Sequence, residues 1–181
     1  MVEKWETIDD TFIANHRIFN VHKVRRRHRV WNKESDFVVL DSPPWVNIIP
    51  VTPDNRIVLI EQYRHGIDDI TLEIPGGLVE TGEVPRVAGE RECLEETGYS
   101  GNGEALLLGE NQPNPAFLNN ICYSYIWFGC KKIKDQKLDG NEDINTIEIP
   151  AEVLKNYILS GKIRHSLVLT AFYFYSLKYG L

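Results

Sequence analysis

Three carboxylates lie close together on one expected helix. Glu92, Glu95 and Glu96 follow Pro85 and precede Gly98, and these two residues favour the first turn of a helix and the position just past its end. A helix advances ~100° per residue, which places the three carboxylates within an arc of roughly 100°. Such a cluster resists ionisation on its own, whereas hard divalent cations bind oxygen ligands of this kind. The spacing therefore indicates a divalent-metal site.

Neighbouring residues favour this metal site over an ordinary acidic surface. Glutamate favours helices and often lies on solvated helix faces, so the carboxylates alone leave both interpretations open. Gly76 and Gly77 precede the helix, and without Cβ atoms they allow the chain to bend sharply and bring a backbone carbonyl close to a metal ion. Arg91 adds a positive charge within the acidic run. Together these residues predict a turn and a helix that build one site.

The elements that position this site follow from apolar periodicity and turn signals. The expected strands are residues 46–51, 57–63, 105–108 and 121–133, the first two forming a hairpin around Pro53-Asp54-Asn55. The expected helices are residues 84–97, 151–159 and 167–178. Ser166 is expected to cap the last helix.

The composition limits the class of protein. At 181 residues, the chain fits one globular domain with a short additional element. A net charge of -6 argues against a dedicated nucleic-acid binder. The three cysteines are odd in number and match no zinc-ligand spacing, and the N-terminus has no signal-peptide pattern, so a cytoplasmic location is expected. The apolar stretch at residues 167–177 is too short to span a bilayer, and no membrane association is expected.

The segment from Gly77 to Tyr99 resembles the Nudix box at every fixed position. Gly77 is followed after five residues by Glu83, and after seven more by Arg91-Glu92-Cys93-Leu94-Glu95-Glu96-Thr97-Gly98-Tyr99. The seven fixed residue types make a chance match on the order of 1 in 10⁸ per window. In this family Arg91 and Glu83 would form a structural pair that holds the loop on the helix. The resemblance therefore implies a pyrophosphohydrolase.

The same resemblance implies the fold and the metal ligands. The fold would be the Nudix α/β/α sandwich, with a mixed sheet between helices. The carbonyl of Gly76 and the carboxylates of Glu92 and Glu96 would bind Mg²⁺, or Mn²⁺ as a substitute, with Glu95 assisting metal binding and catalysis. Metal ions there would polarise a diphosphate and lower the pKa of an attacking water. Cys93 occupies an aliphatic position and is expected to be a small buried apolar residue.

Further segments resemble the branch of ADP-ribose and nucleoside-diphosphate-sugar pyrophosphatases. They are Glu61-Gln62-Tyr63-Arg64 with the following Leu72-Glu73-Ile74-Pro75-Gly76-Gly77, the proline 16 residues after Tyr99, the acidic run Asn141-Glu142-Asp143-Ile144, and the helical ending at residues 151–175. The resemblance implies that Arg64 grips a diphosphate bidentately and supports catalysis. It also assigns Glu73, Pro115 and Trp45 to substrate binding, and Glu142 to the catalytic base.

Ordinary structural roles stay open for several of these residues. Arg64 would otherwise be an exposed arginine at a strand end, and Glu142 part of a solvated acidic loop. Trp45 would otherwise be a core or interface residue. His165 is a further candidate for substrate contact, although a histidine before a helix is more often a cap or a surface residue.

Residues 1–42 are expected to form a small antiparallel β element apart from the Nudix hydrolase domain at residues 43–181. Val24 and Val30 would lie on one side of a strand, with the basic residues of the run 22–29 on the other. That basic side is either a solvated strand face or a face that attracts phosphate. In relatives this segment joins its partner across a dimer, so the resemblance implies a homodimer with residues 25–29 and Trp31 as candidate cross-subunit contacts.

The sequence thus predicts Mg²⁺-dependent hydrolysis of the pyrophosphate bond of ADP-ribose or a related nucleoside diphosphate sugar, giving a nucleoside monophosphate and a sugar phosphate. Two alternatives stay open. The same box serves hydrolases of nucleoside triphosphates, dinucleoside polyphosphates or RNA caps, and the basic run at residues 22–29 keeps RNA substrates open. A non-hydrolytic module that senses a nucleotide would usually lack some box glutamates, and here all are present.

Overall fold

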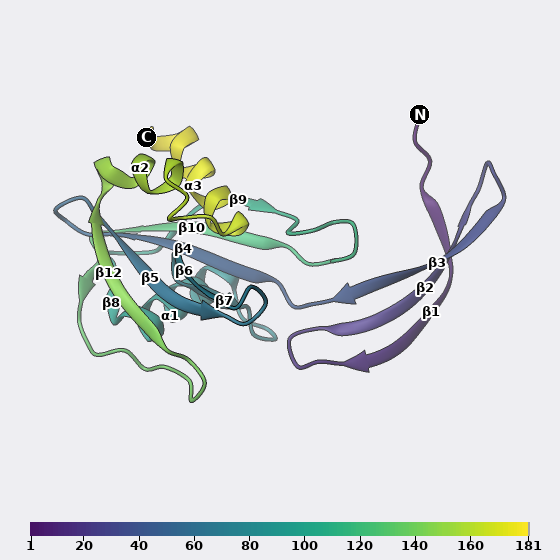
Figure 1. Cartoon of the computed structure of the whole chain (residues 1–181), viewed down its shortest axis with the longest axis horizontal. Helices are drawn as coiled ribbons and strands as arrows, with labels where there is room; N and C mark the ends of the chain where they lie inside the picture. Colours follow the sequence, from purple (N-terminus) through teal and green to yellow (C-terminus); the bar gives the residue numbers. More distant parts are fainter. Residues whose placement is uncertain (181) are drawn as a thin grey trace. The chain divides into compact units, whose positions relative to one another are not determined.

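The structure, a computed structural model, describes residues 1–180 and contains two compact units (Figure 1). The N-terminal unit consists of Met1–Pro43 and Gln112–Ile121, and the larger unit consists of Pro44–Asn111 and the described residues from Cys122 onward. The N–H of Leu40 donates to the carbonyl of Phe117 at 2.7 Å, which ties the second segment of the N-terminal unit to the first. No helix within residues 1–180 is long and apolar enough to cross a membrane.

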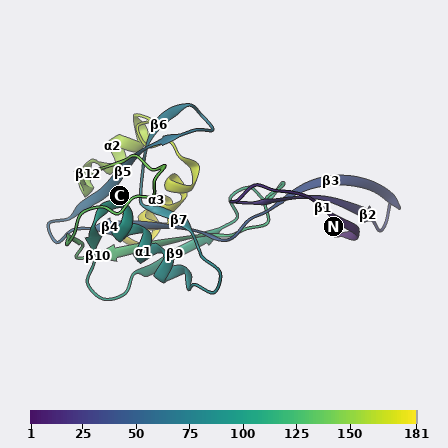
Figure 2. The same ribbon diagram turned by 90° about the horizontal axis from the view of Figure 1, so that it is seen from below.

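Three antiparallel strands form the sheet of the N-terminal unit. They are β1 (Trp5–Asn15), β2 (Asn20–His28) and β3 (Lys33–Asp41), which Figure 2 shows as a single layer. The expected small antiparallel element is therefore confirmed. Val24 is buried, but Val30 is 69% exposed because β2 ends at His28 and Val30 lies in the following turn. The prediction that the two valines share one side of a strand is wrong.

The basic residues of β2 are paired with acidic residues of β3. Nε of Arg25 and Nζ of Lys23 each lie 2.8 Å from a carboxylate oxygen of Asp36, and Nη2 of Arg27 lies 2.7 Å from Glu34. The hydrogen bonds from Arg25 and Lys23 hold the pKa of Asp36 well below its usual range. Because these charges are compensated within the sheet, the arrangement favours a solvated strand face over a face that attracts phosphate.

Seven strands form the mixed sheet of the larger unit. Their order is β12-β5-β4-β10-β9, with β6 beside β5 and β7 beside β4. Their bounds are β4 (Trp45–Val51), β5 (Arg56–Arg64), β6 (Asp69–Glu73), β7 (Gly76–Leu78), β9 (Leu106–Asn111), β10 (Cys122–Phe128) and β12 (Ile144–Pro150). β10 runs parallel to β4, and the other neighbours run antiparallel. A separate ribbon pairs β8 (Tyr99–Ser100) with β11 (Lys131–Lys132).

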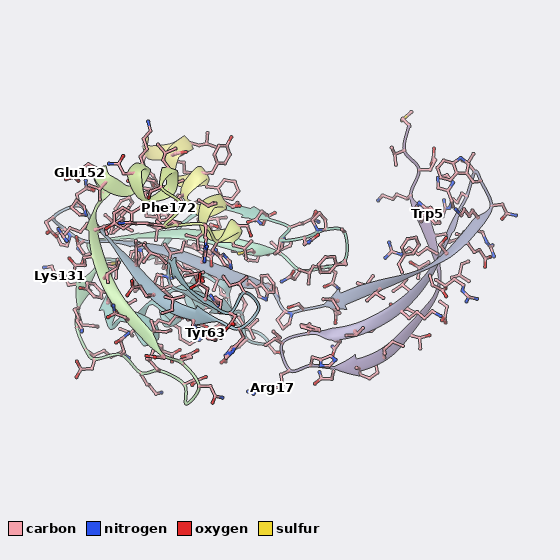
Figure 3. The ribbon with its side chains drawn as sticks, in the orientation of Figure 1. Trp5, Arg17, Tyr63, Lys131, Glu152 and Phe172 are labelled. Atoms are coloured by element: carbon pink, nitrogen blue, oxygen red, sulfur yellow. The ribbon has the colours of Figure 1, made fainter. Side chains whose placement is uncertain are left out.

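Helices cover both faces of this sheet (Figure 1). Because strand side chains alternate, β4 sends Ile48 into the core shared with α1 (Pro85–Thr97) and Ile49 into the core on the opposite face. The second core contains side chains of α2 (Leu154–Leu159) and α3 (Ser166–Tyr179), including Phe172 of α3 (Figure 3). The predicted α/β/α sandwich with a mixed sheet is confirmed.

Several elements differ from the expected ones: β9 continues to Asn111, α2 begins only at Leu154 after a 3-10 turn, and β6, β7 and β12 lie outside the expected strands. The last helix already begins at Ser166, whose carbonyl accepts a hydrogen bond from the hydroxyl of Thr170, and His165 takes the N-cap position without a side-chain hydrogen bond. The prediction that Ser166 caps this helix is therefore wrong. The strand expected at residues 121–133 ends at Phe128, because Gly129 has a φ of 68° that redirects the chain.

All three cysteines are free and buried within the described chain. Cys93 lies in the core between α1 and the sheet, as expected of a small apolar residue at that position. A hydrogen bond with Cys130 and burial raise the pKa of the Cys93 thiol, and burial raises the pKa of Cys122 to about 12. The three thiols thus behave as apolar packing groups.

The end of α1 requires a glycine. Gly98 has a φ of 76°, its N–H donates to the carbonyl of Leu94 at 3.0 Å, and its carbonyl accepts the N–H of Ile133 at 2.9 Å. A Cβ at Gly98 would lie 2.1 Å from the carbonyl oxygen of Lys134. Both the backbone conformation and the close approach of the next segment therefore exclude a side chain.

We expect Gly98→Ala to destabilise the fold more than Gly82→Ala. Both glycines have a positive φ, 76° and 82°, and a left-handed backbone destabilises a non-glycine residue by about 1–2 kcal/mol. Gly98 alone adds a steric clash, since a Cβ at Gly82 meets nothing within 4 Å. Urea unfolding followed by circular dichroism measures both losses. Equal losses would contradict the role of the contact with Lys134.

Candidate active site

The glycine pair lies against both the sheet and the acidic helix. Gly76 and Gly77 form β7 together with Leu78 and pair with β4 as extended backbone, so the expectation of a sharp bend at these glycines is wrong. A Cβ on Gly77 would lie 2.3 Å from Oε1 of Glu92, and one on Gly76 would lie 2.2 Å from the carbonyl oxygen of Val46. Glycine is required here for room rather than for a special backbone angle.

Glu96 is the most enclosed carboxylate of the helix. It is 4% exposed, and its Oε2 accepts the N–H of Gly76 at 2.9 Å. Burial raises the pKa of Glu96 to about 8; the hydrogen bond from Gly76 opposes this rise, and the negative charges of Glu92 and Glu142 add to it. A buried carboxylate of this kind is stabilised as an anion by a nearby positive charge.

Arg91 connects the loop before α1 to the acidic residues. Its Nε and Nη2 donate to the two carboxylate oxygens of Glu83, each at 3.0 Å, and Nη2 also donates to the carbonyl of Leu78 at 3.1 Å. The pair expected between Arg91 and Glu83 is therefore present. Nη1 donates to Glu92 at 2.9 Å and to Glu95 at 3.1 Å. One guanidinium thus fixes the loop and orients two further carboxylates.

The oxygen atoms near β7 suit a hard divalent cation, which prefers carboxylate and carbonyl ligands. Glu92 and Glu96 lie against successive glycines, and burial raises the pKa of Glu92 as well. Within residues 1–180, no three acidic, histidine or cysteine side chains lie close enough to form a complete metal cluster. In this structure Glu92 is bonded to Arg91 and Glu96 to Gly76.

Arg64, at the end of β5 just after Tyr63 (Figure 3), is held by a buried carboxylate. Its Nε and Nη2 donate to the oxygens of Glu73 at 2.8 and 2.7 Å, and the hydroxyl of Thr71 donates to Glu73 at 2.5 Å. Glu73 is 2% exposed, so its carboxylate serves Arg64 and Thr71. Sequence reasoning missed Thr71, although its position two residues before Glu73 on one strand face was a usable signal.

Glu142 lies in an exposed turn before β12. Its backbone N–H donates to the carbonyl of Asp139 at 2.9 Å, and its carboxylate accepts the N–H of Asp139 at 2.9 Å. The negative charge of Glu142 raises the pKa of Glu92, of Glu96 and of Arg64. The fold therefore brings this turn within electrostatic range of residues from β5 and α1.

The remaining candidates lie in three places. Trp45 is the first residue of β4, where it is half-buried and pairs in register with Leu78. Pro115 belongs to the N-terminal unit, in the segment Gln112–Ile121. His165 precedes α3, and among the described residues its buried Nδ1 has no hydrogen-bond partner. Burial lowers the pKa of His165, while the negative charge of Glu73 opposes that shift.

Comparison with known proteins identifies the family. The family model described as NUDIX domain matches residues 41–165. The methanol dehydrogenase activator of Bacillus methanolicus is 33% identical over 144 residues, which cover 79% of this chain and 77% of the relative. The ADP-ribose pyrophosphatase of Bacillus subtilis (strain 168) is 25% identical over 150 residues, which cover 82% of this chain and 80% of the relative. A crystal structure of an ADP compounds hydrolase has the same fold, with a TM-score of 0.84 at 17% identity over 100% of this chain and 99% of that chain. The chain therefore belongs to the Nudix family, is similar to its ADP-ribose pyrophosphatase branch, and is a Nudix pyrophosphohydrolase.

Proposed function

We propose that this chain hydrolyses the pyrophosphate bond of ADP-ribose or a related nucleoside diphosphate sugar with Mg²⁺, giving a nucleoside monophosphate and a sugar phosphate. One observation carries the proposal. Arg64, Glu96 and Glu142 come from three separate segments, and the negative charge of Glu142 raises the pKa of both Arg64 and Glu96. In this proposal the three residues supply a cation for phosphate oxygens, a carboxylate for a metal and a carboxylate that accepts a proton.

Arg64 is the group that binds the diphosphate. A planar guanidinium matches two phosphate oxygens, and Glu73 holds that of Arg64 in one orientation from its buried side. Mg²⁺, or Mn²⁺ in its place, bound by the carbonyl of Gly76 with Glu92 and Glu96 would polarise the diphosphate and lower the pKa of a water. Charge that develops on the phosphoryl oxygens is then shared with Arg64.

Glu142 acts as the general base. Glu92 and Glu96 serve the metal in this proposal, so a separate carboxylate is better placed to accept the proton from the attacking water. Glu95 is bonded to Arg91 and assists by keeping that guanidinium in place. The turn that carries Glu142 is exposed, which allows it to close over a bound substrate. Trp45, the first residue of β4, completes the substrate contacts of the larger unit.

The N-terminal sheet joins two copies of the chain as a homodimer. Apolar side chains that stay exposed on its strands support this proposal: Ile8, Phe12, Ile13, Phe37 and Val38. Exposed apolar patches on a protein surface mark interaction sites. The pairing of the β2 cations with Asp36 and Glu34 removes the charge repulsion that would oppose association. We also propose a cytoplasmic location, with which three free thiols are compatible.

A substrate panel tests the function. ADP-ribose, GDP-mannose, UDP-glucose, NADH and dGTP are each incubated with the protein and Mg²⁺, and the nucleoside monophosphate that forms is measured by chromatography. We expect the highest kcat/KM for ADP-ribose, with AMP and ribose phosphate as products and no turnover in EDTA. A higher kcat/KM for dGTP than for ADP-ribose would contradict the proposal and identify the chain as a nucleoside triphosphate hydrolase.

A second candidate function follows from the relative in Bacillus methanolicus. That relative is named a methanol dehydrogenase activator and is 33% identical to this chain, more than the 25% of the ADP-ribose pyrophosphatase. By this similarity the chain would stimulate an alcohol-oxidising enzyme. Adding it to a purified alcohol dehydrogenase tests this candidate, and a rate that does not depend on the added chain would exclude it for that enzyme.

We expect Glu96→Gln to weaken Mg²⁺ binding and to reduce turnover. A neutral amide replaces a buried anionic ligand, so the affinity should fall by about tenfold or more. Isothermal titration measures the affinity, and Glu152→Gln, an exposed glutamate of the same chain, is the control. Unchanged Mg²⁺ affinity in Glu96→Gln would remove this residue from the metal site.

We expect Glu73→Gln to lower both stability and kcat/KM, with a defined pH dependence. Burial raises the pKa of Glu73, but the bonds and charge of Arg64 lower it by more, so the net pKa lies below the ordinary value. Such a carboxyl stabilises the fold above about pH 4.3, and the effect is lost as pH falls through the folded-state pKa. Chemical unfolding at a series of pH values should therefore show a stability gap to wild type that narrows as pH falls below about 4.3. A gap that is constant with pH would contradict the ion pair.

We expect Glu142→Gln to fold, to bind Mg²⁺ and ADP-ribose, and to turn over at least ~100-fold more slowly, because loss of a general base leaves binding nearly intact. Steady-state kinetics at saturating Mg²⁺ measure kcat, and Asp143→Asn is the matched control from the same exposed turn. If Glu142→Gln keeps a kcat near that of wild type, or Asp143→Asn loses the activity instead, the base must be another residue.

A further inference from the structure

The segment between β11 and β12, residues 133–143, is anchored on the C-terminal end of α1. The N–H of Ile133 donates to the carbonyl of Gly98 at 2.9 Å, and the N–H of Lys137 donates to the carbonyl of Glu95 at 2.8 Å. Nearly all side chains of the segment are exposed, and only Gln136 and Leu138 are half-buried. When a polar side chain of an exposed segment is partly buried, it is expected to form hydrogen bonds with neighbouring groups.

The side-chain amide of Gln136 bridges the helix and the start of β12. Its Nε2 donates to the carbonyl of Ile144 at 3.1 Å and to the hydroxyl of Thr146 at 3.2 Å. It also donates to the backbone carbonyl of Glu96. The amide nitrogen carries two hydrogens, so two of the three acceptors share one of them. Both donors of Gln136 are therefore used. One side chain thus ties the start of β12 to the C-terminal end of α1, and Gln136 closes the loop at its base.

The closed loop contains the proposed base. Between Lys137, which is bonded to Glu95, and Ile144, which pairs with Gln62 in the sheet, the chain is free except for the turn that joins Asp139 to Glu142. The position of Glu142 relative to Glu96 therefore depends on where the base of the loop is fixed. A displacement of about 1 Å at a catalytic group can reduce the rate by ~10²-fold.

We propose that Gln136 is a positioning residue for hydrolysis, one that sets the place of Glu142 relative to the metal-binding end of α1. The inference rests on the proposed function of Glu142 and adds a residue outside the Nudix box to it. Gln136 touches backbone carbonyls and a hydroxyl, so it acts through the loop and not on the substrate.

Gln136→Met tests this role, because methionine has a similar shape and no donor. We expect kcat for ADP-ribose to fall by about tenfold or more, as for other groups that support a catalytic residue. KM and the Mg²⁺ affinity should stay within about twofold of wild type, because misplacing a general base leaves substrate and metal binding nearly intact. Lys134→Met, an exposed residue of the same segment, is the control and should keep the wild-type kcat.

A double-mutant cycle separates positioning from general destabilisation. If Gln136 acts through Glu142, adding Gln136→Met to Glu142→Gln should lower kcat no further. Losses that multiply, or a single Gln136→Met variant with wild-type kcat, would overturn the proposal.

Hydrogen exchange keeps the test independent of the substrate. The hydrogen-bonded amides of Lys137, Asp139 and Glu142 should exchange faster in Gln136→Met than in wild type or Lys134→Met. Unchanged exchange would overturn the proposal even without an activity assay. If the wild-type chain hydrolyses none of the panel substrates, the proposed function fails, and the exchange result still decides whether Gln136 anchors the loop.

Discussion

The glycines of β7 lie between the backbone of β4 and the carboxylates of α1, and the rest of the site depends on this contact. It brings the N–H of Gly76 to 2.9 Å from Glu96 and places Gly77 against Glu92. β4 pairs with β7 and also with β5, the strand that carries Arg64. The position of Arg64 is therefore linked to that of β7 through β4. Residues that are distant in sequence are thus positioned by the same set of backbone contacts.

The carboxylates around β7 differ in how their charge is compensated. Ionised carboxylates are unfavourable in a protein interior unless they are paired, and Arg64 and Arg91 pair with Glu73 and Glu83. Glu96, the most enclosed of the helix carboxylates, has an N–H as its partner instead. A cation bound there, as proposed, would stabilise the folded chain as well as the reacting diphosphate, because a ligand that binds only the folded state adds to its stability.

Local patterns predicted the fold well, and long-range partners set the limit. As expected, α1 begins at Pro85 and ends just before Gly98, because the effects of these residues on the backbone act over a single turn. The segment Gln112–Ile121 returns to the N-terminal unit through bonds to residues far away in sequence, which no local pattern encodes. The same holds for the carboxylate that orients Arg64. Sequence reasoning found Glu73 but assigned it to the substrate, since a sequence does not state which charges face each other.

The buried cysteines have a practical consequence. A thiol reacts as its thiolate, and Cys93, Cys122 and Cys130 are enclosed in the fold, with the pKa raised at the first two. Maleimide reagents should therefore leave the folded wild-type chain unlabelled. A cysteine introduced on the surface of each unit would then be labelled selectively with a fluorophore. Energy transfer between the two fluorophores would measure the distance between the N-terminal unit and the larger unit in solution.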